Sequence, residues 1–327
     1  MKPYRLSARA AAAAGIFVTI AAIVWFWTST HSFTQSAFVV CPGVAFTLML
    51  MLGSGNVLER LQHWINMQPA RVMLVPAGLW LLYVVYAVGM NIAGGTAVIT
   101  MAVYLTVPFV AFWPVRNMAG RLWLEPLVIL WIWLPLELGI VRRILITTPG
   151  ADLHYAFAQL LAIDAGVVAF AVWDRMSYIG YRFEADRNIL RSGLSNFLMF
   201  SAIAIPLGLV IRFISYSFSI SKLYPMPALF AGIFLFTALP EEFLFRGLIQ
   251  NWIEHATGNT RVSLIVAAVI FGAAHLNNGP PIPNYRYFLM AGIAGVFYGR
   301  AWRSTGSLMA SSLTHALVDT FWSVFFR

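Results

Sequence analysis

The chain has 327 residues, of which 60% are hydrophobic and only 10% are charged. A water-soluble domain of this length does not need so apolar a composition, so we expect an α-helical protein that crosses a membrane several times. The short alternating segments typical of a membrane β-barrel do not occur in the sequence. The net charge of +9 rests on 21 Lys and Arg residues spread through short loops. This spread fits loops on an acidic lipid surface better than a clustered nucleic-acid patch, so we expect no nucleic-acid partner.

The first part of the chain starts with a basic segment that contains Lys2, Arg5 and Arg9 and continues into an apolar run. No small-x-small cleavage site follows the run, so we predict a retained first helix with a cytoplasmic N-terminus in a prokaryotic inner membrane. An amphipathic surface segment is predicted over residues 53–71. Further spans are predicted near residues 36–52, 72–93, 96–114, 122–140 and 155–173. Residues 1–174 are therefore expected to form an N-terminal membrane region of about six helices, of unknown role.

A polar stretch divides the chain, because residues 174–191 contain seven charged side chains. We predict a charged linker at 175–194 and a second membrane part over 195–327. Its spans are expected near residues 195–216, 226–253, 262–277, 286–302 and 306–326. The predicted fold is an all-α, polytopic transmembrane bundle of about 10–11 spans.

Two adjacent carboxylates and an arginine lie inside the predicted span 226–253, at Glu241, Glu242 and Arg246. Each charge in hydrocarbon costs a few kcal/mol on insertion scales, so such residues rarely persist without a role. Glu242 and Arg246 are four residues apart, so we predict that they pair on one helix face. Glu241 points roughly 100° away from Glu242 and is available for another role. A purely structural ion pair between bundled helices is the alternative reading.

Two histidines and a further acid follow in the last helices. His275 ends an apolar span four residues after Phe271, and His315 and Asp319 lie four apart on one face of the final helix. Each could be a hydrogen-bonded structural residue, but intramembrane ionisable groups face a bundle interior or a water-filled cavity, so we expect them in one site. A carboxylate with one or two imidazoles around water is suited to general-base catalysis and is also a candidate metal site. These residues predict a hydrolase buried in the membrane.

The three motifs Glu-Glu-x-x-x-Arg, Phe-x-x-x-His and His-x-x-x-Asp occur in this order on successive apolar helices. Together they resemble the CAAX protease and bacteriocin-processing (CPBP, or Abi) family, which includes the type II CAAX prenyl endopeptidases. The resemblance covers about residues 195–327, where it implies a catalytic core in the C-terminal helices. It implies an intramembrane endopeptidase that cleaves a membrane-associated peptide or protein with water activated by Glu and His. Glu242, Arg246 and Phe271 are implied to support the site, the first two by holding its geometry or engaging the substrate backbone.

The resemblance also implies roles for the catalytic residues. By position, Glu241 is the general base, and His275 helps to hold and activate the attacking water. His315 and Asp319 are implied to stabilise the tetrahedral oxyanion, a contribution often worth a few kcal/mol for each donor.

One motif position departs from part of the family. Asp319 stands where the eukaryotic and archaeal prenyl proteases have Asn, and an ionised Asp cannot donate a hydrogen bond to an oxyanion. Asp319 is therefore either protonated, or orients His315, or binds a metal. Glu241, His275, His315 and Asp319 include ligand types that suit Zn²⁺, although a His-Glu-x-x-His motif is missing. We favour a metal-free glutamic protease without a cofactor and keep a zinc-dependent version of the same protease as the alternative.

A rival hypothesis from another class is a membrane transporter or a non-catalytic, immunity-type binding protein that keeps the polar cluster for binding. Asp164 and Glu137 are further intramembrane acids, for which we expect interhelical hydrogen bonds or a place on a substrate or proton path. In a transporter they would matter as much as Glu241. Gly292, Gly295 and Gly299 predict close helix packing rather than ligand binding.

Overall fold

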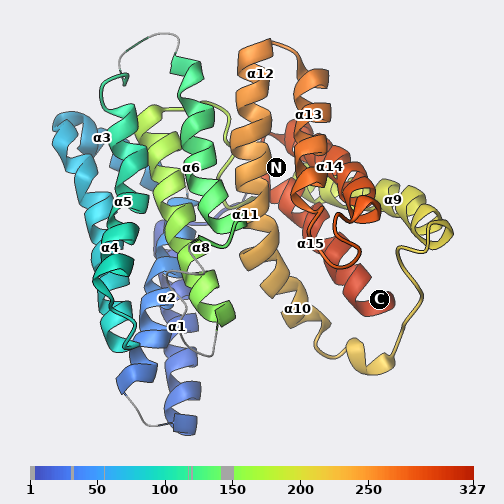
Figure 1. The fold of residues 1–327 in the computed structure, drawn as a ribbon, viewed down its shortest axis with the longest axis horizontal. Coiled ribbons are helices and arrows are strands. Elements are labelled where there is room, and N and C mark those ends of the chain that lie inside the picture. The colour runs from blue at the N-terminus through green and yellow to red at the C-terminus, as the bar shows by residue number, and fades with distance from the viewer. Residues whose placement is uncertain (1–3, 31–32, 55, 117, 119–120, 141–150) are drawn as a thin grey trace. The chain divides into compact units, whose positions relative to one another are not determined.

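The computed structural model describes residues 4–30, 33–54, 56–116, 118, 121–140 and 151–327, most of them in helices (Figure 1). Lys2 of the predicted basic N-terminus lies outside the described residues, as does the region 141–150 between two predicted spans. By their internal contacts, the residues form two compact units, Arg5–Ser177 and Tyr178–Arg327. The only described strands are the two-residue β1 (Tyr4–Arg5) and β2 (Glu184–Ala185). The predicted all-α class is confirmed.

The unit Arg5–Ser177 is a helical bundle around α2, which contacts α1, α4 and α8. Aromatic rings pack in its core, where the ring centroids of Tyr86 in α4 and Phe157 in α8 are 4.5 Å apart. Its α-helices are α1 (Ala8–Thr30), α2 (Phe33–Leu52), α3 (Val57–Met67), α4 (Leu74–Gly89), α5 (Gly95–Phe112), α6 (Glu125–Glu137) and α8 (Ala151–Val167). Two 3₁₀ turns at Pro69–Met73 and Arg121–Trp123 and a π-helical segment at Val168–Asp174 complete it. Helix α3 buries Ile65 and exposes Trp64 and Met67, so the predicted amphipathic character is confirmed.

The unit Tyr178–Arg327 consists of helices that begin and end at well-defined capping residues. Asp186 accepts a hydrogen bond from the Ile189 amide at the start of α9, and the left-handed residues Gly258 and Gly306 end α12 and α14. A 3₁₀ turn lies at Ile220–Lys222. The helices are α9 (Arg187–Val210), α10 (Met226–Ile233), α11 (Leu239–Glu242), α12 (Asn251–Thr257), α13 (Thr260–Ala274), α14 (Tyr285–Thr305) and α15 (Leu308–Phe325). The charged stretch at 175–194 contains β2 and the first turns of α9.

Helices α10, α11 and α12 form one helical run, Met226–Thr257, interrupted by two π-helical segments. These are Phe234–Ala238 and Phe243–Gln250, which flank Leu239–Glu242 on either side. A regular span was expected here, and π-helical turns are rare features that often occur at functional sites. Both glutamates of the first motif therefore lie on the short α-helical stretch between two such segments.

Glycines allow α14 to pack closely against its neighbours. A Cβ at Gly272 of α13 would lie 2.7 Å from the Phe288 carbonyl oxygen of α14, and one at Gly295 would lie 3.0 Å from Ala268 Cα. A Cβ at Gly299 would lie 2.5 Å from Gln250 Oε1. A side chain at these three positions requires a neighbour to move, so the predicted close packing is confirmed at Gly295 and Gly299. A Cβ at Gly292 would lie 3.7 Å from the Ala268 carbonyl oxygen, which is an ordinary contact, so the prediction is not confirmed there.

Five helical segments of the described residues are long and apolar enough to cross a membrane, and a sixth is possible if α2 and α3 form one bent span. The five are Pro69–Gly89, Gly95–Phe112, Tyr155–Asp174, Arg187–Val210 and Met226–Thr257. Helices also occupy the other predicted spans, but α13 is short, and α14 and α15 carry polar side chains that lower their hydropathy. The chain is an integral, multi-pass membrane protein, and the total of 10–11 spans stays a prediction.

Candidate active site

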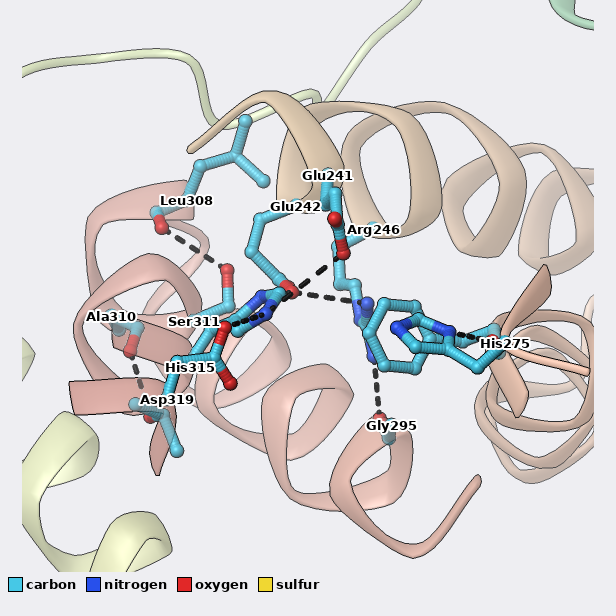
Figure 2. A network of polar contacts seen from close by, with 12 residues as sticks. Glu241, Glu242, Arg246, His275, Gly295, Leu308, Ala310, Ser311, His315 and Asp319 are labelled. Carbon is cyan, nitrogen blue, oxygen red and sulfur yellow. Dashed lines mark hydrogen bonds and ion pairs between the residues drawn. The ribbon is translucent and has the colours of Figure 1, made fainter. Parts of the chain in front are cut away.

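The predicted pair of Glu242 and Arg246 forms a fully buried ion pair. Arg246 Nη1 lies 3.1 Å from Glu242 Oε1, and both side chains have no exposed surface. Arg246 Nη2 also donates a hydrogen bond of 3.0 Å to the carbonyl oxygen of Gly295 in α14 (Figure 2). The guanidinium therefore links the helical turn that carries Glu242 to α14. Breaking such a pair on one side is costly, because the remaining charge stays buried.

His315 of α15 connects this ion pair to the other two carboxylates. Its Nδ1 lies 2.9 Å from Glu242 Oε1, and because Glu242 is paired with Arg246 and accepts, Nδ1 is the donor. Its Nε2 then faces the Oδ2 atom of Asp319 at 3.4 Å and the Oε2 atom of Glu241 at 3.9 Å. The bond at Nδ1 thus fixes both the ring orientation and the identity of the nitrogen that faces the reactive side.

The two neighbouring glutamates differ in exposure. Glu242 is fully buried, whereas 33% of the Glu241 side chain and 36% of the Asp319 side chain are exposed. Glu241 Oε2, the oxygen that faces His315 Nε2, is itself buried and has no hydrogen-bond partner among the described residues, so the exposed part of the side chain does not include this oxygen. A carboxylate that is partly accessible and has a free lone pair can take a proton from a bound water. Glu242 is therefore suited to hold the site and Glu241 to carry out proton transfer.

His275 follows the last turn of α13. Its Nδ1 lies 2.8 Å from the Phe271 carbonyl oxygen and donates to it, which leaves Nε2 as an acceptor in the neutral ring. The Phe271 ring contacts both histidines, with ring centroids 4.6 Å apart for His275 and 5.8 Å apart for His315. Figure 2 shows His275 beside Arg246 in the same cluster. Within the described residues, His275 makes no direct hydrogen bond to Glu241, His315 or Asp319.

Sequence reasoning did not identify Tyr298 as part of this site. Its ring stacks on the His315 ring at 4.5 Å with an interplanar angle of 16°. The Arg246 guanidinium carbon lies 5.3 Å from the centre of the Tyr298 ring and 4.6 Å from that of Phe271, within range of cation–π contacts. The one available signal was the i, i+3 spacing from Gly295, which places Tyr298 on the same face of α14. Tyr298 and Phe271 thereby form apolar walls around the charged groups.

The geometry bears on the zinc alternative. In the part of the chain that the structure describes, no three His, Cys, Asp or Glu side chains are arranged to hold a metal ion. His315 Nδ1 donates to Glu242, which leaves Nε2 as the nitrogen that faces Glu241 and Asp319, and His275 Nδ1 donates to the Phe271 carbonyl oxygen. Glu241 Oε2 and Asp319 Oδ2 both lie near His315 Nε2, but these groups are not arranged to hold a metal ion, so we derive no step through a metal. Metal dependence stays open to experiment.

In the described part of the chain, the other intramembrane acids, Glu137 and Asp164, have no interhelical hydrogen bond of the kind that we expected. Glu137 Oε2 accepts a hydrogen bond of 3.0 Å from Trp133 Nε1 within the same helix. Neither carboxyl oxygen of Asp164 has a hydrogen-bond partner among the described residues, although the residue is only 2% exposed. The expected interhelical hydrogen bonds are therefore not found for either residue in the ranges that the structure describes, and a place on a substrate or proton path stays a prediction.

Comparison with known proteins agrees with the motif analysis. Residues 223–321 match the family model described as Rce1-like, type II CAAX prenyl endopeptidase Rce1-like. Over this segment, the predicted family is confirmed. All the positions of the three motifs lie within it, whereas residues 1–222 lie outside. No curated protein and no solved structure matches the chain.

Proposed function

We propose that this protein is an intramembrane endopeptidase that hydrolyses a peptide bond of a membrane-associated peptide or protein. One observation carries the proposal: the accessible Glu241 faces Nε2 of a histidine whose other nitrogen is held by the buried Glu242–Arg246 pair. A partly exposed base beside a rigid imidazole is suited to activating water. The match to the Rce1-like family supports the same reaction.

The reaction starts with proton transfer from water to the Glu241 carboxylate. The water oxygen attacks the carbonyl carbon of the scissile bond, and the carbonyl electron pair moves to its oxygen. His275 Nε2 can accept the second hydrogen of the water, because Nδ1 is committed to Phe271. When the intermediate collapses, the C–N bond breaks, and the proton on Glu241 passes to the leaving amine. The second hydrogen of the water stays on the new carboxyl group until that group passes it to the amine, so the products are a carboxylate and an ammonium group, and Glu241 is regenerated.

The developing oxyanion needs a donor, and His315 Nε2 is the candidate. Asp319 cannot donate when ionised, and its distance of 3.4 Å from His315 Nε2 supports the second of the three roles considered for it. In that role it orients the imidazole and stabilises positive charge on it. An imidazolium bonded through Nδ1 to Glu242 carries one hydrogen on Nε2, and we infer that this hydrogen is shared between Asp319 and the oxyanion during the reaction.

The finer properties of the enzyme follow from the same proposal. We infer a metal-free, glutamic-type mechanism, with the zinc-dependent version as the second candidate because the site combines imidazole and carboxylate groups. The family name suggests a C-terminal CAAX peptide carrying a prenyl group as one substrate class, and a bacteriocin or pheromone leader is another. The basic N-terminal segment favours a cytoplasmic N-terminus in a prokaryotic inner membrane.

The test is proteolysis of a peptide library by the purified protein in lipid nanodiscs. The library contains prenylated and unprenylated C-terminal peptides and leader peptides. Wild type is compared with Glu241→Gln and with the control Glu137→Gln, each with and without a strong chelator. We expect cleavage by wild type and Glu137→Gln, no cleavage by Glu241→Gln, and no effect of the chelator. Loss of cleavage on chelation would instead support the zinc-dependent protease, and cleavage by Glu241→Gln at the wild-type rate would overturn the proposal.

A further inference from the structure

The unit Arg5–Ser177 contains a second candidate site, a cavity of about 590 Å³ bordered by α2, α3, α4 and α8. This volume lies within the range of about 300–1,000 Å³ typical of small-molecule sites. All but one of the side chains that line it are apolar, such as Leu48 of α2 and Leu82 of α4. The exception is Asp164 of α8. The cavity therefore combines an aliphatic wall with one carboxyl group.

Asp164 is not satisfied by the protein itself. The residue is 2% exposed, and neither carboxyl oxygen has a hydrogen-bond partner among the described residues. Buried polar groups in folded proteins nearly always have a partner, so a carboxyl group that faces a cavity without one calls for an occupant. A carboxyl group alone in apolar surroundings avoids the cost of ionisation by keeping its proton, so it becomes a carboxylate there only when a positive charge accompanies it.

The cavity wall indicates where an occupant can enter. Leu81 and Val85 of α4 line the cavity and are 58% and 53% exposed, and Leu48 is 37% exposed. Residues Pro69–Gly89 form one of the membrane-spanning segments, so these exposed side chains meet lipid hydrocarbon. An apolar molecule dissolved in the bilayer can therefore reach the cavity without passing through water.

We propose that this cavity binds an apolar molecule that carries a single amine, with the ammonium group at Asp164 and the hydrocarbon body against α2 and α4. A metal ion is a poor fit, because the lining contains one carboxyl group and otherwise only apolar residues and Gly78. A zwitterionic phospholipid headgroup is also a poor fit, because it would bring a phosphate into the same aliphatic wall. Binding at Asp164 does not require peptide hydrolysis.

Two variants test separately whether binding depends on the charge of Asp164 and whether it depends on free space in the cavity. Asp164→Asn keeps the size of the side chain and removes its charge. Gly78 lines the cavity, and a Cβ there would meet no atom within 4 Å, so Gly78→Leu fills space without a clash. Gly232 of α10, in the other unit, has equally open surroundings, so Gly232→Leu is the matched control.

The experiment uses dodecylamine and dodecanol that carry the same diazirine at the chain end, with the full-length protein in phosphatidylcholine nanodiscs. After irradiation, labelled residues are mapped by mass spectrometry. We expect the amine to label α2 and α4 of wild type at least about tenfold more than the alcohol, because a buried charge pair is lost with the alcohol. Asp164→Asn should reduce amine labelling to the level of the alcohol. Gly78→Leu should reduce amine labelling severalfold, and Gly232→Leu should leave it unchanged.

Equal labelling of wild type by the amine and the alcohol would overturn the proposal, as would unchanged amine labelling in a folded Asp164→Asn protein. Size-exclusion chromatography shows whether each variant is folded. If Asp164→Asn does not fold, the comparison of amine with alcohol on wild type, together with Gly78→Leu, decides the question.

Discussion

The buried ion pair of Glu242 and Arg246 allows a quantitative prediction for Arg246→Met. Methionine approximates the apolar length of arginine but removes its charge and donors. The variant loses the contact of 3.1 Å to Glu242 and the hydrogen bond of 3.0 Å to the Gly295 carbonyl oxygen. Glu242 then keeps only His315 as a partner, in a position without exposed surface. The main cost is therefore the loss of the arginine partner of a buried carboxylate, which His315 alone compensates less well.

Loss of one partner from a buried pair typically costs about 3–5 kcal/mol, so we expect a reduction of this size in the free energy of unfolding. The double variant Glu242→Gln, Arg246→Met removes the buried carboxylate as well, so it should be more stable than Arg246→Met alone. Arg303 and Glu254 provide a matched comparison, because their ion pair is 40% and 23% exposed. Arg303→Met should cost only about 0–1 kcal/mol.

The assay is equilibrium unfolding in mixed micelles, followed by tryptophan fluorescence and circular dichroism to check for a two-state transition. The free energies of the two single variants and the double variant are compared with that of wild type. The reasoning is refuted if Arg246→Met costs no more than Arg303→Met. It is equally refuted if the double variant is less stable than Arg246→Met alone.

Three further predictions concern packing and catalysis. Gly272→Val should lower the free energy of unfolding by about 1–3 kcal/mol, because its Cβ would lie 2.7 Å from the Phe288 carbonyl oxygen. The control Gly232→Ala should be close to neutral, because a Cβ there meets no atom within 4 Å. Both are measured by equilibrium unfolding, and equal effects would contradict the packing argument. Asp319→Asn removes the charge that stabilises positive charge on His315, so it should lower kcat with an unchanged metal content; loss of metal and activity together would indicate a metal ligand, and substantial retained activity would indicate a protonated Asp319 instead. His275→Ala should lower kcat by about 10²–10⁴-fold with normal folding, and a wild-type kcat would exclude a role in water activation.

The helices and the first ion pair could be predicted from the sequence because they depend on local spacing. Apolar runs of sufficient length define the spans, and Glu242 and Arg246 meet because residues four apart share a helix face. The same rule placed His315 beside Asp319. Asp186 and the glycines Gly258 and Gly306 also mark helix ends in the usual way.

The rest of the site could not be predicted, because it depends on how helices pack. The bond between Glu242 and His315 joins residues 73 positions apart, and no spacing rule reports which nitrogen is engaged. The exposure of Glu241 and the burial of Glu242 depend on the same packing, as does the stacking of Tyr298 on His315. The π-helical segments around Leu239–Glu242 leave no clear sequence signal either.

At Asp164, the sequence led to an expectation that the structure does not support. A carboxyl group in an apolar helix suggested an interhelical hydrogen bond, since buried polar groups usually have partners. The neighbouring helices instead present apolar side chains, and the carboxyl group faces a cavity. A sequence shows that a buried polar group needs a partner, but the identity of the partner depends on the side chains that the fold brings near.

The most direct test of the central claim is the single-turnover rate of peptide cleavage in nanodiscs by wild type, Glu241→Gln and Glu137→Gln, on a substrate from the library. Loss of the general base should lower the rate of Glu241→Gln by at least about 10²–10⁴-fold, with an unchanged free energy of unfolding. Glu137→Gln should cleave at the wild-type rate, because Glu137 bonds only to Trp133 among the described residues. A folded Glu241→Gln protein that cleaves as fast as wild type would show that Glu241 is not the base and would contradict the proposed mechanism.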